Sequence, residues 1–485
     1  MESAAIGNRL AKQPMGMSLV LNDEEWQSQF RAAIADVGDG MSYAEAARRL
    51  RAVVGTGLLK LDDIRARPSR FFLAHRLLAA HATRLGPGFF IRFTVHFNLF
   101  AGTVVALGTD QQLADLIARN AATPRLGCFA LTERLAGVNS GLVVDTTATF
   151  HKESGTFVIE SPHKGAGKNW ISQGLVADDA VVVATLTVNG KSYGPQAFLV
   201  PLRDTNGNLL PGVTATDMGR KTVGNDLDNA SLEFKNFSIP RSALLARYLR
   251  VEPDGSVVLP AGNKRTMDMI GQRLFTGRVA VAQAALQFSR GLFASTRSFA
   301  QAKECWAPQG RTRLFDVPQI KDIFARADTQ LGYLDAFVAE VEKQLSVCLM
   351  QGAIPPVKLQ QAIAVCKVKG LDVSIALCHA LKQEVGSYAL MAGTGFEQLD
   401  FLQCCKFAEG DSRILMQKMA RDAFRTGKAT SGHPAEAAAL DALKAALVKH
   451  KGNKNAWDMC WREVYALAES HMEGVLAGYG VRARL

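Results

Sequence analysis

The order in which hydrophobic patterns change along the chain constrains the fold more than any single motif. From residue 22 to about residue 125, apolar residues recur at intervals of three and four behind plausible N-cap residues, which is typical of amphipathic helices. From residue 126 to residue 240, short runs rich in Val, Thr and Phe are separated by Gly, Asn and Asp, and this pattern predicts strands. Long helical periodicity returns after residue 264. We therefore expect an α+β chain with a helical domain at 1–124, an antiparallel β domain at 125–248 and a second helical domain at 249–485.

The composition is that of a large globular protein without a membrane span. Of the 485 residues, 48% are hydrophobic, which is enough for a sizeable core. The most apolar stretch, residues 88–107, contains Arg92, His96 and Asn98, which a lipid-facing helix would tolerate poorly, so we expect a buried core helix. The first residues lack the pattern of a secretory signal, and the eight cysteines lack CxxC spacing, so we expect reduced thiols in an intracellular compartment. We expect residues 426–439 to form a surface loop.

The net charge of +11 does not indicate a nucleic-acid partner. Lys and Arg are spread along the chain, and no stacking aromatic residues alternate with them. Small phosphorylated ligands fit such a charge better. A basic proteome or compartment explains the charge equally well, and in that case the charge says nothing about a ligand.

Several motifs occur in the order and spacing of one enzyme family. They are GCFALTERLAGVN at 127–139, DTTATF at 145–150, KNWISQG at 168–174, the segment 217–248, the segment 278–306, MAGTGFE at 391–397 and AEGDSRILMQ at 408–417. In this order the sequence resembles the acyl-CoA dehydrogenase and acyl-CoA oxidase superfamily over roughly residues 120–425. The resemblance implies FAD as the cofactor, acyl-CoA as the substrate and a central β domain similar to a barrel.

Glu409 is the candidate catalytic base. Removal of two hydrogens across Cα and Cβ of an acyl thioester needs a base for the Cα proton and an acceptor for the Cβ hydride, and a flavin, unlike any side chain, accepts hydride. Glu409 matches the family's Glu-Gly position and follows an apolar segment, which would raise its basicity. The resemblance also implies that its backbone N–H and a flavin hydroxyl stabilise charge on the thioester oxygen. The alternative is that Glu409 merely favours the positive end of a helix beginning near Asp411.

The resemblance implies two groups of FAD-binding residues. Thr132, with its neighbours Leu131 and Glu133, matches a position that bonds the isoalloxazine edge, and Trp170 and Ser172 match positions beside the flavin ring. Lys303 stands where the family commonly has an Arg that binds the FAD pyrophosphate of a neighbouring subunit, so we expect a homodimer or homotetramer. Each residue also has an ordinary alternative as a strand-end, core, cap or surface residue. The remaining matches to FAD positions are Trp306, Gln319, Gly393, Gly395 and Asp411.

Three further residues match positions near the substrate. Arg278 aligns with a helix Arg that contacts CoA in the family, and Asn139 and Gly410 also match substrate positions. The first motif departs from the family pattern, because it has an apparent one-residue insertion before DTTA and Arg134 replaces a small or apolar residue. The way in which this loop would bind the pantetheine or the thioester therefore stays open.

Three features bear on the electron acceptor and on the location of the protein. The segment 226–256 looks like oxidases, whose flavin is reoxidised by O₂, whereas Ser172 favours a dehydrogenase that passes electrons to a flavoprotein. The last residues, Ala483 to Leu485, resemble a tripeptide read by the peroxisomal import receptor, which favours a peroxisome or a related organelle such as a glycosome or glyoxysome over a mitochondrion. We predict an acyl-CoA oxidase of fatty-acid β-oxidation. The alternative of another class is a non-catalytic, acyl-CoA-binding or structural member of the family.

Overall fold

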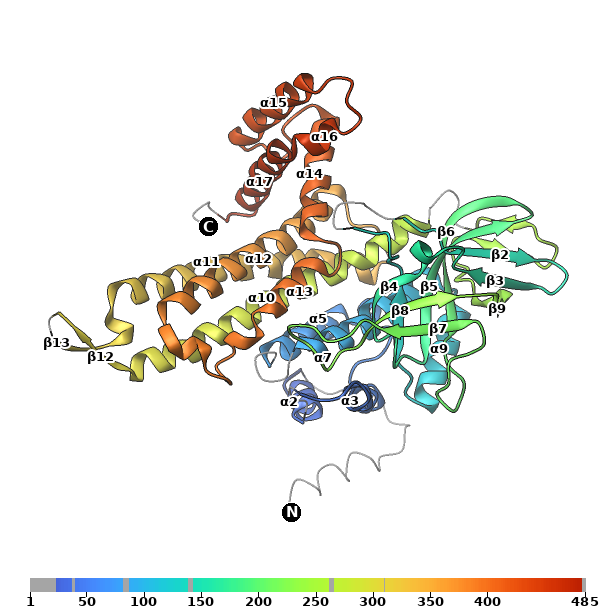
Figure 1. Cartoon of the computed structure of the whole chain (residues 1–485), viewed down its shortest axis with the longest axis horizontal. Helices are drawn as coiled ribbons and strands as arrows, with labels where there is room; N and C mark the ends of the chain where they lie inside the picture. The colour runs from blue at the N-terminus through green and yellow to red at the C-terminus, as the bar shows by residue number, and fades with distance from the viewer. Residues whose placement is uncertain are drawn as a thin grey trace, which may run out of the picture.

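The computed structural model describes residues 23–36, 40–81, 87–137, 143–260, 266–308 and 310–481, without the side chains of 266–270, 272 and 273. A β domain forms one end of the molecule, and a long helical bundle extends from it to the other end (Figure 1). The N-terminal helices lie beside the junction of these two parts, and a smaller group of C-terminal helices lies on the bundle. The predicted order of helices, strands and helices is confirmed.

The N-terminal helices pack around a continuous apolar segment, Pro87–Leu107. This segment is long and apolar enough to cross a membrane by composition, but 89% of its most apolar window is buried inside the protein, as expected for a core helix. Its middle turn, η1, is a π-helix. The helices of this part are α2 (Asp23–Ile34), α3 (Tyr43–Gly55), α4 (Asp63–Ala66), α5 (Pro68–Ala80), α7 (Pro87–Thr94), η1 (Val95–Ala101), α8 (Gly102–Leu107) and α9 (Asp110–Ala122).

The central domain contains two main sheets and is not a closed barrel. The larger sheet has the order β1-β5-β2-β3-β9 with β6 on the other edge of β5, and the smaller sheet has the order β4-β8-β7. The strands are β1 (Gly127–Ala130), β2 (Thr147–His151), β3 (Thr156–Glu160), β4 (Lys168–Ser172), β5 (Asp179–Val188), β6 (Lys191–Pro201), β7 (Val213–Asp217), β8 (Asn229–Phe234) and β9 (Phe237–Pro240). A short hairpin of β10 (Arg250–Val251) and β11 (Val257–Val258) follows.

The prediction of a wholly antiparallel domain is corrected by two parallel pairings. Strand β5 is 10 residues long, and β1 pairs in parallel with its first half while β2 pairs in parallel with its second half. Two short strands thus follow one another along the same edge of a longer one. Apolar alternation marks which residues face the core but carries no information about strand direction, so the sequence pattern could not distinguish the two arrangements.

Three long helices form the bundle, and a β-hairpin closes its far end. The helices are α10 (Thr266–Ala302), α11 (Pro318–Met350) and α12 (Val357–Glu384), and the hairpin consists of β12 (Glu304–Ala307) and β13 (Gly310–Arg313). The short turns η5 (Gly386–Leu390) and η6 (Phe396–Gln398) and the helix α13 (Asp400–Phe407) then bring the chain back along the bundle (Figure 1).

The last helices form a unit with a small core of its own, which includes Leu440, Leu443 and Leu467. Residues 426–439 are not entirely a loop, because α15 already begins at Pro434, a residue favoured in the first helical turn. The eight cysteines are free thiols, as expected. The helices of this unit are α14 (Ser412–Thr426), α15 (Pro434–Lys449), α16 (Ala456–Met459) and α17 (Trp461–Gly478).

Candidate active site

Glu409 lies in the turn between α13 and α14 in a strained backbone conformation. Its φ angle is 58°, in the left-handed region that non-glycine residues rarely adopt. Strain of this kind is common at functional sites. Helix α14 is capped by Asp411, whose carboxylate accepts a hydrogen bond from the backbone N–H of Arg413 at 2.7 Å. The helix-start role that was the alternative for Glu409 therefore belongs to Asp411, and the predicted cofactor role of Asp411 stays a prediction.

The Glu409 carboxylate is packed against the backbone of α10. Glu409 is only 8% exposed, and a Cβ atom added to Gly277 would lie 2.1 Å from its Cδ atom. Glycine at position 277 thus makes room for the carboxylate. The Oε2 atom is buried and has no hydrogen-bond partner among the described residues. Burial raises the pKa of Glu409 to about 7, although Asn98, Arg278 and Lys367 favour the charged form.

Asn98 reaches Glu409 from the π-helical turn η1. Its side-chain amide donates a hydrogen bond to Oε1 of Glu409 at 3.2 Å, across 311 residues of sequence. π-helical turns often occur at functional sites because they change the direction of a side chain within a helix. The sequence signal for Asn98 was its position as a polar residue in the most apolar stretch of the chain, but no functional role was predicted for it.

Two cations hold the backbone of the same turn. Arg278 donates from Nε to the carbonyl oxygen of Glu409 at 3.1 Å. Lys367 on α12 donates to the carbonyl oxygens of Lys406, at 2.7 Å, and of Gly410. Gly410 has a φ angle of 89°, and an added Cβ atom would approach the Arg278 guanidinium to 3.3 Å. The structure thus brings Arg278 and Gly410 to Glu409, and their predicted contacts with the substrate stay predictions, whereas no role was predicted for Lys367.

The predicted flavin-edge residues lie just after the end of β1 and on β4. The backbone N–H of Asn169 donates to the Thr132 carbonyl at 2.9 Å, which places Thr132 beside β4. Trp170 is 56% exposed and has a φ angle of 59°, at a shift of register between β4 and β8. The Ser172 hydroxyl accepts a hydrogen bond from the Asn229 amide at 3.1 Å. An exposed indole in a strained bulge is not a core residue, which argues against the ordinary alternative for Trp170.

Glu133 has a structural partner instead of a free side chain. Its carboxylate pairs with the Lys168 ammonium at 2.8 Å, and both side chains are at most 1% exposed. The same carboxylate accepts hydrogen bonds from the backbone N–H groups of Asp145 and Thr146, and Lys168 also donates to the Leu131 carbonyl. Burial lowers the pKa of Lys168 to about 8. The pair fixes the loop after β1 and engages the Glu133 carboxylate, so the predicted cofactor contacts of Leu131 and Glu133 stay predictions.

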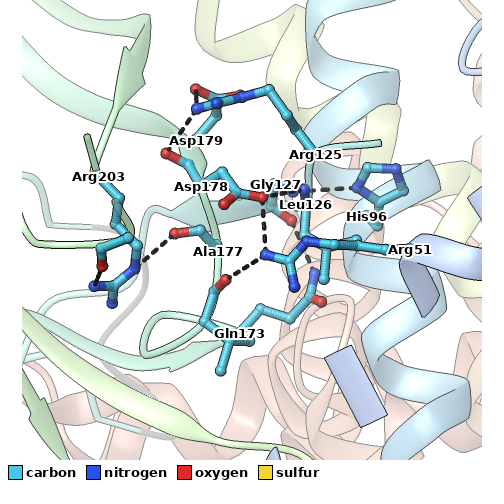
Figure 2. A network of polar contacts seen from close by, with 12 residues as sticks. Arg51, His96, Arg125, Leu126, Gly127, Gln173, Ala177, Asp178, Asp179 and Arg203 are labelled. Carbon is cyan, nitrogen blue, oxygen red and sulfur yellow. Dashed lines mark hydrogen bonds and ion pairs between the residues drawn. The ribbon is translucent and has the colours of Figure 1, made fainter. Parts of the chain in front are cut away.

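A polar network joins β1 to the N-terminal helices (Figure 2). Asp178 accepts hydrogen bonds from the Arg51 guanidinium at 2.9 Å and from the backbone N–H of Leu126 at 2.8 Å. The next N–H, that of Gly127, donates to Nδ1 of His96 on η1 at 3.2 Å. Burial lowers the pKa of His96 to about 3, so its ring is neutral and can accept this bond. The network fixes η1, which carries Asn98, against the strand that leads to Thr132.

The other predicted FAD residues lie at the far end of the bundle. The hairpin of β12 and β13 lies at the end of the bundle away from the β domain (Figure 1). Lys303 is exposed just after α10, and Trp306 on this hairpin is 79% exposed. The turn with Gly393 and Gly395 lies at the same end, because Tyr388 just before it stacks on Phe299 of α10 at 3.7 Å. The N–H groups of both glycines donate to the Glu397 carboxylate. Gln319 is exposed near the start of α11.

Two predictions lie outside the described residues. Asn139 and the C-terminal tripeptide at 483–485 are not among the described residues, so their roles stay predictions.

Arg134, which departs from the family pattern, donates to the Ser231 hydroxyl at 2.7 Å and to the Glu233 carboxylate at 3.0 Å. Its guanidinium therefore binds to the neighbouring strand β8.

Glu409→Gln should stabilise the folded protein at alkaline pH and have a small effect in acid. The pKa of Glu409 rises from 4.5 to about 7 on folding, so the folded state binds the proton more tightly and stability is lost as the pH rises through this window. The glutamine avoids this cost, which amounts to about 3 kcal/mol at about pH 8 and less than about 1 kcal/mol at about pH 5. Chemical melts of both proteins at the two pH values measure the difference. A difference independent of pH would contradict the raised pKa.

Known proteins resemble this chain in sequence and in fold. No family model matches the chain. It is 29% identical to acyl-coenzyme A oxidase 1 of Yarrowia lipolytica over 357 residues, which are 68% of this chain and 51% of that protein. The crystal structure of acyl-CoA oxidase 1 from the same yeast matches with a TM-score of 0.74 and 20% identity, over 95% of this chain and 77% of that one.

A second solved structure comes from Caenorhabditis elegans. Its acyl-CoA oxidase-2, bound with FAD, ascaroside-CoA and ATP, matches with a TM-score of 0.75 and 19% identity, over 93% of this chain and 75% of that one. The chain spans about half the length of the first curated relative, 51%. The chain is thus similar to acyl-CoA oxidases in sequence and in fold, in line with the resemblance predicted from its motifs.

Proposed function

We propose that this protein is an FAD-dependent acyl-CoA oxidase, which removes two hydrogens from an acyl-CoA to form the trans-2-enoyl-CoA in fatty-acid β-oxidation. The observation that carries the proposal is the Glu409 carboxylate. It is buried, one of its oxygens lacks a partner among the described residues, and its pKa of about 7 suits a general base near neutral pH. A carboxylate that only stabilised the fold would be expected to have both oxygens satisfied.

Each residue near the turn has a distinct part in this proposal. Glu409 takes the Cα proton, and Asn98 holds its Oε1 so that Oε2 is directed to the substrate. Arg278 holds the Glu409 carbonyl and so fixes the turn, in which the backbone N–H of Glu409 would bind the thioester oxygen. FAD, when bound, supplies the acceptor for the Cβ hydride.

The residues fit a flavin best if two copies of the chain contribute to each site. The exposed Trp170, with Thr132 and Ser172, offers an open surface near η1 for the ring system. Lys303, Trp306 and the glycine turn lie at the opposite end of the molecule (Figure 1). One FAD cannot reach both groups within a chain, so the far end of one copy would meet the β domain of another. The similar C. elegans structure, which contains FAD and a CoA thioester, supports this cofactor and substrate class.

The purified protein should carry FAD, form a dimer or tetramer and produce hydrogen peroxide when it receives acyl-CoA in air. Light scattering, the visible flavin spectrum and a peroxide assay with butanoyl-, octanoyl- and palmitoyl-CoA measure these three properties. If acyl-CoA reduces the flavin but oxygen does not reoxidise it, the protein is instead a dehydrogenase, the alternative that the polar Ser172 favours. A colourless monomer that does not bind added FAD would contradict the proposal and leave the non-catalytic role. A peroxisomal location stays a prediction from the sequence.

A further inference from the structure

Lys367 is a buried lysine whose ammonium has no carboxylate partner within ion-pair distance among the described residues. The side chain is 0% exposed, on α12, where Ile363, Val365 and Leu371 are also buried. A buried charge without a paired counter-charge is unfavourable unless other groups solvate it. In this case the ammonium is satisfied by two carbonyl oxygens, those of Lys406 and Gly410, which lie on either side of Glu409.

The electrostatic surroundings connect Lys367 to the base. The groups that act on it are Arg278 from α10, Cys405 from α13, and Glu409 and Asp411 from the turn before α14. Burial and the nearby Arg278 lower its pKa to about 7, whereas Asp411, Cys405 and Glu409 favour its charged form. In the opposite direction, the positive charge of Lys367 lowers the pKa of Glu409. The two groups are therefore coupled, and each favours the charged form of the other.

We propose that Lys367 is a positioning residue for Glu409, which holds the catalytic turn by its two carbonyl contacts and keeps the carboxylate ionised through its charge. This inference rests on the proposed function, because it takes Glu409 as the base. The Lys406 and Gly410 carbonyls flank the residue with the strained φ angle of 58°. Loss of the ammonium would leave both oxygens without this donor and would allow the turn to relax.

Lys367→Met tests the proposal, because methionine fills the same volume without donors or charge. We expect the rate of flavin reduction at saturating acyl-CoA to fall by about tenfold or more, since the base loses its fixed position. We also expect the acidic limb of the pH–rate profile to move upward by about one pH unit, since Glu409 loses a neighbouring positive charge. Anaerobic stopped-flow measurements across the pH range give both quantities, and thermal melts and FAD content report folding.

Two further variants complete the experiment. Lys367→Gln keeps an N–H donor but not the charge, so it should retain more of the rate and still show the shifted limb. It also provides the same test if the methionine variant does not fold. Lys369→Met is the matched control, because Lys369 lies on the same helix but pairs with Glu469 and Glu473 of α17 at 2.8 and 2.6 Å. This control should leave the pH profile unchanged.

The outcomes distinguish the inference from the function on which it rests. A wild-type protein whose flavin is not reduced by any acyl-CoA contradicts the proposed function itself. An active wild type together with a Lys367→Met variant of unchanged rate and profile contradicts the role of Lys367. A slower variant without a shift of the limb also contradicts it, because a purely structural lysine would produce that result.

Discussion

Glu409→Gln should leave FAD bound and slow the reduction of the flavin by acyl-CoA by at least about 10² to 10⁴, the usual contribution of a positioned general base. Glutamine keeps the size of the side chain and can still meet Asn98, but its amide oxygen does not accept a proton at neutral pH. Acyl-CoA should still bind and perturb the flavin spectrum. Anaerobic stopped-flow reduction with butanoyl-, octanoyl- and palmitoyl-CoA measures the rate.

A second buried glutamate provides the control for this experiment. Glu436 is 0% exposed, and its hydrogen bonds to Ser431 and His471 lie in the C-terminal unit, away from the catalytic turn. Glu436→Gln should lower the melting temperature and leave flavin reduction close to normal. If Glu409→Gln behaved in the same way, with a stability change of about 1 kcal/mol or less and normal reduction, Glu409 would have only a structural role.

Gly277→Ala should reduce activity almost as strongly, although the residue touches neither cofactor nor substrate in our proposal. The new Cβ atom would lie 2.1 Å from Cδ and 2.2 Å from Oε2 of Glu409, so the carboxylate must move. A displacement of about 1 Å can cost about 10²-fold in rate. We expect a loss of this order in flavin reduction, measured in the same stopped-flow experiment.

The helix that carries Gly277 offers a matched control. Gly291 is also on α10, and a Cβ atom added there would meet nothing within 4 Å. Gly291→Ala should therefore keep full activity and gain up to about 1 kcal/mol of stability, because alanine favours the helix. Shortening the base in the double variant Gly277→Ala, Glu409→Asp should recover part of the lost space. Equal activities of Gly277→Ala and Gly291→Ala would show that the carboxylate position is not critical.

The sequence predicted the architecture well where periodicity decides it. Helical and strand periods differ strongly, so the three-part order and the buried helix at Pro87–Leu107 could be predicted. The parallel pairing of β5 with β1 and β2 could not be predicted, because alternation gives only the face of each residue. The π-helical turn η1 was also missed, since one extra residue in a turn hardly changes an apolar pattern.

The candidate site divides in a similar way. Glu409, Arg278 and Gly410 could be predicted from motifs because the resemblance carries their positions, and the structure brings them together. Asn98, Gly277 and Lys367 could not, because their role depends on contacts between segments far apart in sequence. Glu133 illustrates the opposite case, in which a motif residue proved to be half of a buried ion pair with Lys168.

The span of 311 residues between Asn98 and Glu409 has a consequence for the synthesis of this protein. At typical rates of chain elongation, about 15 to 60 s pass after the ribosome adds Asn98 before it adds Glu409. For the first part of this interval, until the ribosome has added Thr266–Ala302, the apolar helix Pro87–Leu107 exists without α10, which packs against η1 and α8 in the folded protein. A helix of such high hydropathy would bind chaperones, or other unfinished chains, until its cover emerges. Yield in cells would therefore depend on how the first half of the chain is protected while the second half is still being made.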